Sequence, residues 1–354
     1  MAVEAPAPPS RLEQLLARPR PSVISILGLV FVALIFVWLL VNFVKEPANF
    51  IDVALIGMTN GLVFGLVALG YTLVYGILQL INFAHGDLFA LSGLLASTMI
   101  LTVFDLTPAD SVLVIVGGLI VTFLVAMAFG ATLNASIERV AYRRLRHAPR
   151  LAPLITAVGM SFIIQNVALA IYGVQAKDVP NLIPATNVFS IGGVDYQWNK
   201  LFVVLVTVPT LIALTWLVAN TRHGKAMRAT SQDPDAAAMM GININRTISF
   251  TFLLAGALAG VGAVLFLLQF NMRYDTGFEL GLIAFTAAVL GGIGNLTGAV
   301  LGAVLIGMIQ AFNEGLTWLT PGGDWTRSIV FGVLIAILVF RPEGLLGERT
   351  PEGQ

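Results

Sequence analysis

Long apolar runs alternate with short polar segments along the whole chain. The apolar runs cover residues 22–44, 53–80, 88–104, 112–134, 151–172, 201–219, 247–270, 281–312 and 328–340. Most of them have roughly the 20 residues that an α-helix needs to cross the hydrocarbon core of a bilayer. The pattern therefore predicts an all-α polytopic membrane protein with about eight or nine transmembrane helices.

Glycine residues mark where these helices are expected to pack closely. Two sets recur at intervals of four residues and so lie on one helix face each: Gly57, Gly61 and Gly65, and Gly256 and Gly260. The run 281–312 is long for one helix, and Gly291, Gly292 and Gly294 interrupt it. We expect a broken or re-entrant segment there, packed inside the protein, because lipid does not tolerate irregular backbone.

Composition agrees with a membrane protein and excludes several other classes. The chain is 57% hydrophobic and only 11% charged, whereas soluble domains contain about 25% charged residues. Its outer surface is therefore expected to contact a lipid bilayer. Lys and Arg balance Asp and Glu at 19 each, which gives no indication of nucleic-acid binding. There is no cysteine, and His85, His147 and His223 lack the spacing of metal ligands, so no metal site is predicted.

The distribution of basic residues predicts the side of the membrane that each loop faces. Most Lys and Arg residues lie in segments 1–21, 138–150, 220–246 and 341–354, which we place in the cytosol. The run 22–44 is too long for a signal peptide, and we interpret it as an uncleaved helix that leaves the N-terminus in the cytosol. This orientation requires the segment 281–312 to enter and leave the membrane on the same side. Residues 138–150 are expected to form a basic loop.

No residue pattern indicates that the chain hydrolyses a substrate or binds a nucleotide. A P-loop needs G-x-x-x-x-G-K-[ST], but Lys225, which follows a glycine, has alanine at positions 219 and 226. The acidic residues cluster at the ends of the apolar runs, whereas an ion-driven carrier normally buries an acid in mid-membrane. If ATP drives this protein, it therefore acts through a separate subunit. The alternative is a self-contained channel or ion-coupled secondary carrier, and the lack of mid-membrane acids argues against it.

The polar segment 221–246 contains the most specific local signal. Asp233 is placed to cap a helix, and Pro234 suits the first helical position. Gly241 is placed to end that helix. The residues assigned to the helix and its border are Arg228, Asp233, Pro234, Asp235, Ala236, Ala237, Met240 and Gly241. Two interpretations stay open at this point: a helix that docks on a partner protein, or a solvated connector with one capped turn.

Polar residues inside the apolar runs are candidates for a translocation path. They are Asn60, Tyr71, Asn82, His85, Gln165 and Asn166. Such residues line a path or bond across helices, and the sequence does not separate these alternatives. His85 and Asp87 lie at a helix break, where a gate is one interpretation. We favour a structural role for Asp87, as the N-cap of the helix that follows.

Four blocks of the sequence resemble, in order, branched-chain amino-acid ABC importer permeases of the LivH type. They are GLVFGLVALGYTLVYGILQLINFAHGDLFALSG, LITAVGMSFIIQN, TRHGKAMRATSQDPDAAAMMGININRTISFTFLLAGALAGVGAVL and AFTAAVLGGIGNLTGAVLGAVLIG. The resemblance covers residues 50–347, and residues 1–49 lie outside it. It implies the ABC importer permease fold and a place in the bacterial inner membrane.

The resemblance also implies partners. A permease of this kind pairs with a sister permease, here a heterodimer, with two cytosolic ATP-binding cassette subunits and with a periplasmic substrate-binding protein. The chain itself would bind no cofactor, since ATP and Mg²⁺ act through the partner ATPase. Its short cytosolic helix at 233–241 would dock on that ATPase. Similar permeases import branched-chain amino acids, urea, short amides or other small acids, and the sequence leaves these substrates open.

These inferences divide the chain into four parts. We expect a cytosolic N-terminal segment at 1–21, an additional transmembrane helix at 22–44, a permease domain at 45–347 and a cytosolic tail at 348–354. The coupling loop at 220–246 belongs to the permease domain.

Overall fold

The computed structural model describes residues 23–146, 148–149, 151–341 and 343–347. The chain divides into two compact units, Met1–Pro47 and Ala48–Gln354. The first contains helix α2 (Val23–Lys45), which coincides with the apolar run at 22–44. The predicted cytosolic segments 1–21 and 348–354 lie outside the described residues.

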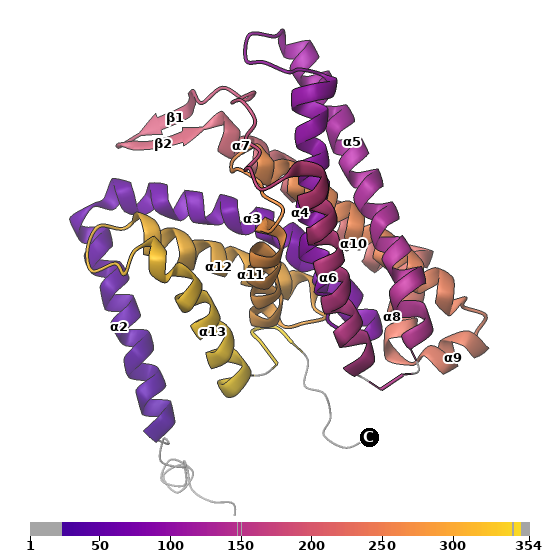
Figure 1. Ribbon diagram of the computed structural model, residues 1–354. Coiled ribbons are helices and arrows are strands. Elements are labelled where there is room, and N and C mark those ends of the chain that lie inside the picture. The colour runs from indigo at the N-terminus through magenta and orange to yellow at the C-terminus, as the bar shows by residue number, and fades with distance from the viewer. Residues whose placement is uncertain (1–22, 147, 150, 342, 348–354) are drawn as a thin grey trace, which may run out of the picture. The chain divides into compact units, whose positions relative to one another are not determined.

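Helices make up almost all of the second unit (Figure 1). In chain order they are α3 (Pro47–Leu78, from Ala48 in this unit), α4 (Ala84–Thr98), α5 (Val112–Ile137), α6 (Leu151–Tyr172), α7 (Trp198–Asn220), α8 (Arg222–Gln232), α9 (Pro234–Met239), α10 (Ile244–Leu267), α11 (Thr276–Gly291), α12 (Leu296–Gly315) and α13 (Thr326–Phe340). A π-helical turn, η1 (Met99–Val103), continues α4, and a 3-10 turn, η4 (Gly323–Trp325), precedes α13. Within the described residues, 8 helical segments are long and apolar enough to cross a membrane. This confirms the predicted all-α polytopic fold.

The central helices of the second unit are α3, α4 and α10, whose apolar residues are mostly buried. Helices α5, α6, α7 and α13 lie further out, and few of their apolar residues are fully buried. Examples are Leu113 on α5, Ile155 on α6 and Ile212 on α7. A soluble protein rarely exposes so many large apolar side chains. These outer faces suit contact with lipid, as the composition predicts.

Glycine lets α5 and α10 approach each other backbone to backbone. A Cβ added at Gly256 of α10 would lie 2.1 Å from the carbonyl oxygen of Gly130 on α5. At Gly260, one turn further along α10, it would lie 2.3 Å from the carbonyl oxygen of Ala126. Since neither position has room for a methyl group, glycine sets the distance between these two helices.

The glycine series on α3 faces α12. A Cβ at Gly57 would lie 2.8 Å from the Cα of Met308, and one at Gly61 would lie 2.6 Å from the Cα of Val304. At Gly65, the third member of the series, the nearest atom would be a side-chain carbon at 3.7 Å. The first two glycines therefore require close backbone packing, while the third has ordinary van der Waals space.

The structure confirms the predicted break in the run 281–312. Helix α11 ends at Gly291, and α12 begins at Leu296. Between them, Gly292 and Gly294 have φ angles of 106° and 95°, which favour glycine.

Helices α11 and α12 then run antiparallel against each other. A Cβ at Gly298 would lie 2.3 Å from the carbonyl oxygen of Gly291, and one at Gly302 would lie 2.1 Å from that of Ala287. The two helices therefore pack against each other on both sides of the turn that joins them, and the side of the membrane on which the segment begins and ends stays a prediction.

Two connections between the long helices contain regular structure. The expected basic loop at 138–150 is wrong in its first half, because α5 continues through a π-helical turn, η2 (Glu138–Tyr142), and a 3-10 turn, η3 (Arg143–Leu145). Between α6 and α7, β1 (Asn187–Ile191) pairs antiparallel with β2 (Val194–Gln197) through the Gly192–Gly193 turn. This hairpin and α9 lie at opposite ends of the second unit (Figure 1).

Candidate functional site: the α8–α9 segment and its cavity

Helix α8 forms the first half of the polar segment between α7 and α10. Thr221 caps it, since its hydroxyl accepts a hydrogen bond from the Gly224 amide at 3.1 Å. Gly224, Met227 and Thr230 are buried at intervals of three residues, so one face of α8 packs inward. Sequence reasoning missed this helix, although the Thr cap and the spacing of these buried residues were available as signals.

Helix α9 follows directly and has the predicted caps. The Asp233 carboxylate accepts hydrogen bonds from the amides of Asp235 and Ala236, each at 2.9 Å. Pro234 occupies the first helical position, and Gly241 follows the helix with a φ of 82°. These features confirm the predicted helix; its docking role stays a prediction.

The two faces of α9 differ in exposure. Ala237 is buried, and its amide donates to the Asp233 carbonyl. Met239 and Met240 at the end of the helix are each 83% exposed. These two exposed methionine side chains form a small apolar surface on a polar segment, which we call the methionine knob. Partner proteins commonly cover exposed apolar surfaces of this kind.

Arg228 lies on α8 and bonds to the end of α7. Its guanidinium donates to the carbonyl oxygens of Val218 and of Ala219, the latter at 3.2 Å, at the C-terminal end of α7. Cationic side chains favour this end of a helix, where the last carbonyls lack partners. Arg228 therefore joins α8 to α7, and its predicted contact with an ATPase stays untested.

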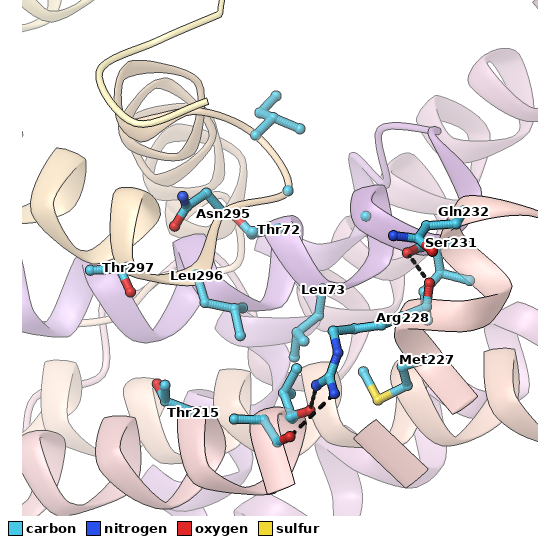
Figure 2. Close-up of a pocket in the computed structure, with 16 residues that line it drawn as sticks. Thr72, Leu73, Thr215, Met227, Arg228, Ser231, Gln232, Asn295, Leu296 and Thr297 are labelled. Atoms are coloured by element: carbon cyan, nitrogen blue, oxygen red, sulfur yellow. Dashed lines mark hydrogen bonds between the residues drawn. The ribbon is translucent and has the colours of Figure 1, made fainter. Parts of the chain in front are cut away.

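A cavity of about 560 Å³ opens beside Arg228. Its walls come from the second half of α3, the end of α7, the second half of α8 and residues 293–297 at the junction of α11 and α12. Figure 2 shows Arg228 extending from α8 across this space toward the end of α7. Its volume lies in the range of small-molecule sites in proteins. None of the six predicted path residues lines it.

The predicted path residues instead fall into separate groups. Tyr71 and His85 lie in the core with their ring centroids 4.9 Å apart. Asn82 accepts a hydrogen bond from Tyr142 at 2.8 Å and donates to Asn134 at 3.4 Å.

The remaining path residues lie apart from these. Gln165 donates to Ser161 at 3.3 Å, and Asn60 is half-buried on α3. Asn166 is exposed and bonds to its own helix at Phe162. The structure thus brings Tyr71 and His85 together but leaves the others at different helix contacts.

The favoured role of Asp87 as an N-cap is wrong. Helix α4 begins at Ala84, so Asp87 lies within its first turn, and Phe83 occupies the cap position. The buried Asp87 carboxylate instead accepts a hydrogen bond from the Ser161 hydroxyl of α6. Asp87 therefore connects α4 to α6. Its partner Ser161 lies 74 residues further along the chain, and local sequence signals do not indicate this pairing.

Sequence reasoning also missed a polar cluster around Glu138 at the end of α5. The buried Glu138 carboxylate accepts hydrogen bonds from Arg146 and from Ser249 of α10, the latter at 2.6 Å. Arg143 lies 3.4 Å from the same carboxylate, and Arg146 also donates to Asn245 at 2.7 Å. Burial lowers the pKa of the Arg146 guanidinium, and the Glu138 charge opposes that shift. The cluster fixes the basic segment to the start of α10, just after α9.

Comparison with known proteins assigns the chain to a family. The family model described as "Branched-chain amino acid transport system / permease component" matches residues 53–339. The chain belongs to this family. BraD, a high-affinity branched-chain amino acid transport system permease protein of Pseudomonas aeruginosa, is 40% identical over 84% of this chain and 95% of its own length.

Two further relatives carry the LivH name. LivH of Escherichia coli K12, also a high-affinity branched-chain amino acid transport system permease protein, is 36% identical over 84% of this chain and 95% of its own length. A probable branched-chain amino acid transport permease protein LivH from Methanocaldococcus jannaschii is 28% identical over 80% of this chain and 88% of its own length. The family resemblance inferred from the four sequence blocks is therefore confirmed.

Family membership establishes that the chain is a multi-pass membrane permease of a transport system. The matched range includes α8, α9 and the whole lining of the cavity, whereas α2 lies outside it. The site described above is thus part of the region that this permease shares with its relatives.

Proposed function

We propose that this permease is the membrane subunit of an ATP-driven importer of branched-chain amino acids. The observation that carries the proposal is α9, a capped helix whose Met239 and Met240 project from a polar segment. The relatives are named for branched-chain amino acid transport, which supports the substrate class. The sequence holds no P-loop, so ATP would be hydrolysed by a separate subunit.

The assembly would contain a sister permease, two ATP-binding cassette subunits and a secreted binding protein. The chain would lie in the bacterial inner membrane, with its N-terminus, α8 and α9 in the cytosol, since the basic segments gather on that side. The β1–β2 hairpin would then face the binding protein.

Chain connections and hydrogen bonds on both sides of α9 would carry force from this helix into the membrane. On one side, the amide of Ile242 donates to the Ala237 carbonyl, and Asn243 caps α10 through the Arg246 amide. On the other side, α8 continues into α9 at Asp233 and is joined to the end of α7 by Arg228. A displacement of α9 by the ATPase would therefore be transmitted to both α7 and α10.

The test replaces Met239 and Met240, which are exposed and so are not needed for the packing of the helices. Met239→Glu with Met240→Glu places two charges where the partner surface would be apolar, and we expect uptake of radiolabelled leucine to fall at least about tenfold. The ATPase should also no longer co-purify with the permease. The matched control, Met239→Leu with Met240→Leu, keeps an apolar surface of similar volume and should retain uptake. Normal uptake and ATPase binding by the Glu variant would refute the docking role of α9.

A further inference from the structure

The helical segment that contains α5 is longer than a membrane requires. It runs from Val112 to Leu145 and has 34 residues, whereas about 20 residues cross the hydrocarbon core. Its apolar run ends at residue 134. At the rise of an α-helix, the residues after that point extend roughly 15 Å further. The turns η2 and η3 therefore project beyond the hydrocarbon, at the end of the second unit where α10 begins.

The projecting segment has two different faces. On its inner face, Tyr142 is buried, donates to Asn82 at 2.8 Å and packs its ring against Phe252 of α10, with the centroids 5.7 Å apart. On its outer face, Arg139 and Arg144 are exposed. The inner contacts hold the backbone in place, so the outer face is a fixed surface.

The Glu138 cluster brings a further arginine to the same end of the molecule. Arg146 donates to Asn245 at 2.7 Å, and Arg143 donates to Ser249 at 2.9 Å, both in the first two turns of α10. Arg246, next to Asn245, is exposed. We call Arg139, Arg144 and Arg246 the arginine face. Within the described part of the chain, their guanidinium groups make no hydrogen bond or ion pair.

The positive charge of the arginine face is not balanced by neighbouring acids. The Glu138 carboxylate is already shared by Arg143 and Arg146. On α9, the Asp233 carboxylate accepts from two backbone amides as a cap. Like charges held together repel one another, and an anionic partner relieves that repulsion. The arginine face therefore suits a negatively charged surface.

Two observations favour a protein over anionic lipid headgroups as that surface. Val140 is 73% exposed between Arg139 and Arg144, and protein interfaces are enriched in arginine around an apolar centre. The arginine face also borders α9, because the Ile242 amide donates to the Ala237 carbonyl just before α10 begins. The methionine knob and the arginine face thus lie on either side of the start of α10.

We propose that the arginine face is a second docking surface for the ATPase, next to the methionine knob. It binds an acidic patch on the ATPase, while the knob supplies the apolar contact. The arginines increase the rate of association and make it depend on salt, as charged groups at the rim of an interface do. The proposal rests on the proposed function for the identity of the partner, and it goes beyond it by assigning a separate surface.

The experiment measures the affinity of the ATPase for the permease and its sister subunit in nanodiscs of phosphatidylcholine. Arg139→Glu with Arg144→Glu reverses two charges that bond to nothing in the described protein. We expect this variant to bind the ATPase at least about tenfold more weakly at low salt. Wild-type affinity should fall steeply between about 0.05 and 0.5 M salt, and that of the variant should stay nearly constant. The unfolding transition should not change.

Arg222→Glu with Lys225→Glu is the matched control, since it makes the same change of charge at two exposed cations of α8. It should keep the ATPase affinity within about twofold. Unchanged affinity in the Arg139/Arg144 variant, or an equal loss in the control, would overturn the proposal. So would an effect that appears only when phosphatidylglycerol is added, because the arginines would then bind lipid. In each case, loss of ATPase binding in the Met239/Met240 variant would leave the docking role of α9 standing.

Discussion

Buried polar residues connect helices that the sequence keeps far apart. Glu138 is fully buried, and its carboxylate joins Arg143 and Arg146 to Ser249 of α10. Burying this charge is tolerable because several donors replace the water that it loses. Asp87 differs: Ser161 donates to one of its carboxylate oxygens across two helices, and the other oxygen is buried without a partner among the described residues.

Removing the Glu138 charge should destabilise the protein strongly. Glu138→Gln leaves the half-buried Arg146 without its carboxylate partner, and we expect a loss of about 3 kcal/mol in the free energy of unfolding. Unfolding in mixed detergent and SDS micelles measures this loss. Arg144→Gln, at an exposed arginine of the same segment, is the control and should change stability by less than about 0.5 kcal/mol. Equal stability of the two variants would show that the cluster contributes little.

At the scale of elements, glycine decides which helices become neighbours. Helix α10 meets α5 at Gly256 and Gly260, and α3 meets α12 at Gly57 and Gly61. In a membrane, apolar side chains gain little by leaving lipid, so close backbone packing supplies much of the association energy. Small residues at the crossing points therefore stabilise the association of the helices, as the hydrophobic core does in a soluble helical bundle.

A matched pair of glycine variants tests this role. Gly256→Ala places a methyl group 2.1 Å from the Gly130 carbonyl and should cost about 1–3 kcal/mol, because α5 and α10 must separate. Gly117→Ala on α5 adds a methyl group with no atom within 4 Å, and it should be neutral or stabilise the helix by up to about 1 kcal/mol. The same detergent unfolding assay compares them. A neutral Gly256→Ala would mean that the two helices are not held by this contact.

At the scale of the whole molecule, orientation follows from charge. The β1–β2 hairpin and α9 lie at opposite ends of the Ala48–Gln354 unit (Figure 1). The basic residues predict that the α9 end faces the cytosol.

Cysteine labelling tests the orientation directly, since the chain contains no cysteine. Met239→Cys and Ile191→Cys place a thiol at exposed positions of the α9 end and of the hairpin. In intact spheroplasts, a membrane-impermeant maleimide should label Ile191→Cys but not Met239→Cys. After permeabilisation both should react, which controls for the reactivity of each thiol. Labelling of Met239→Cys before permeabilisation would invert the proposed topology.

The sequence by itself determined what depends on near neighbours along the chain. Hydropathy located the membrane helices, Gly291 to Gly294 located the break between α11 and α12, and Asp233 with Gly241 located the ends of α9. Such signals are readable because each arises from residues within a turn or two of one another. The order of four sequence blocks was enough to indicate the family.

Only the tertiary structure decided what depends on distant partners. It placed Ser161 against Asp87 and Ser249 against Glu138, pairs that lie 74 and 111 residues apart. It also showed that Arg228 bonds to the end of α7 and that a cavity lies among α3, α7, α8 and the α11–α12 junction. The physical reason is that burial and hydrogen bonding of a polar side chain depend on which helices surround it, and hydropathy along the chain does not specify those neighbours.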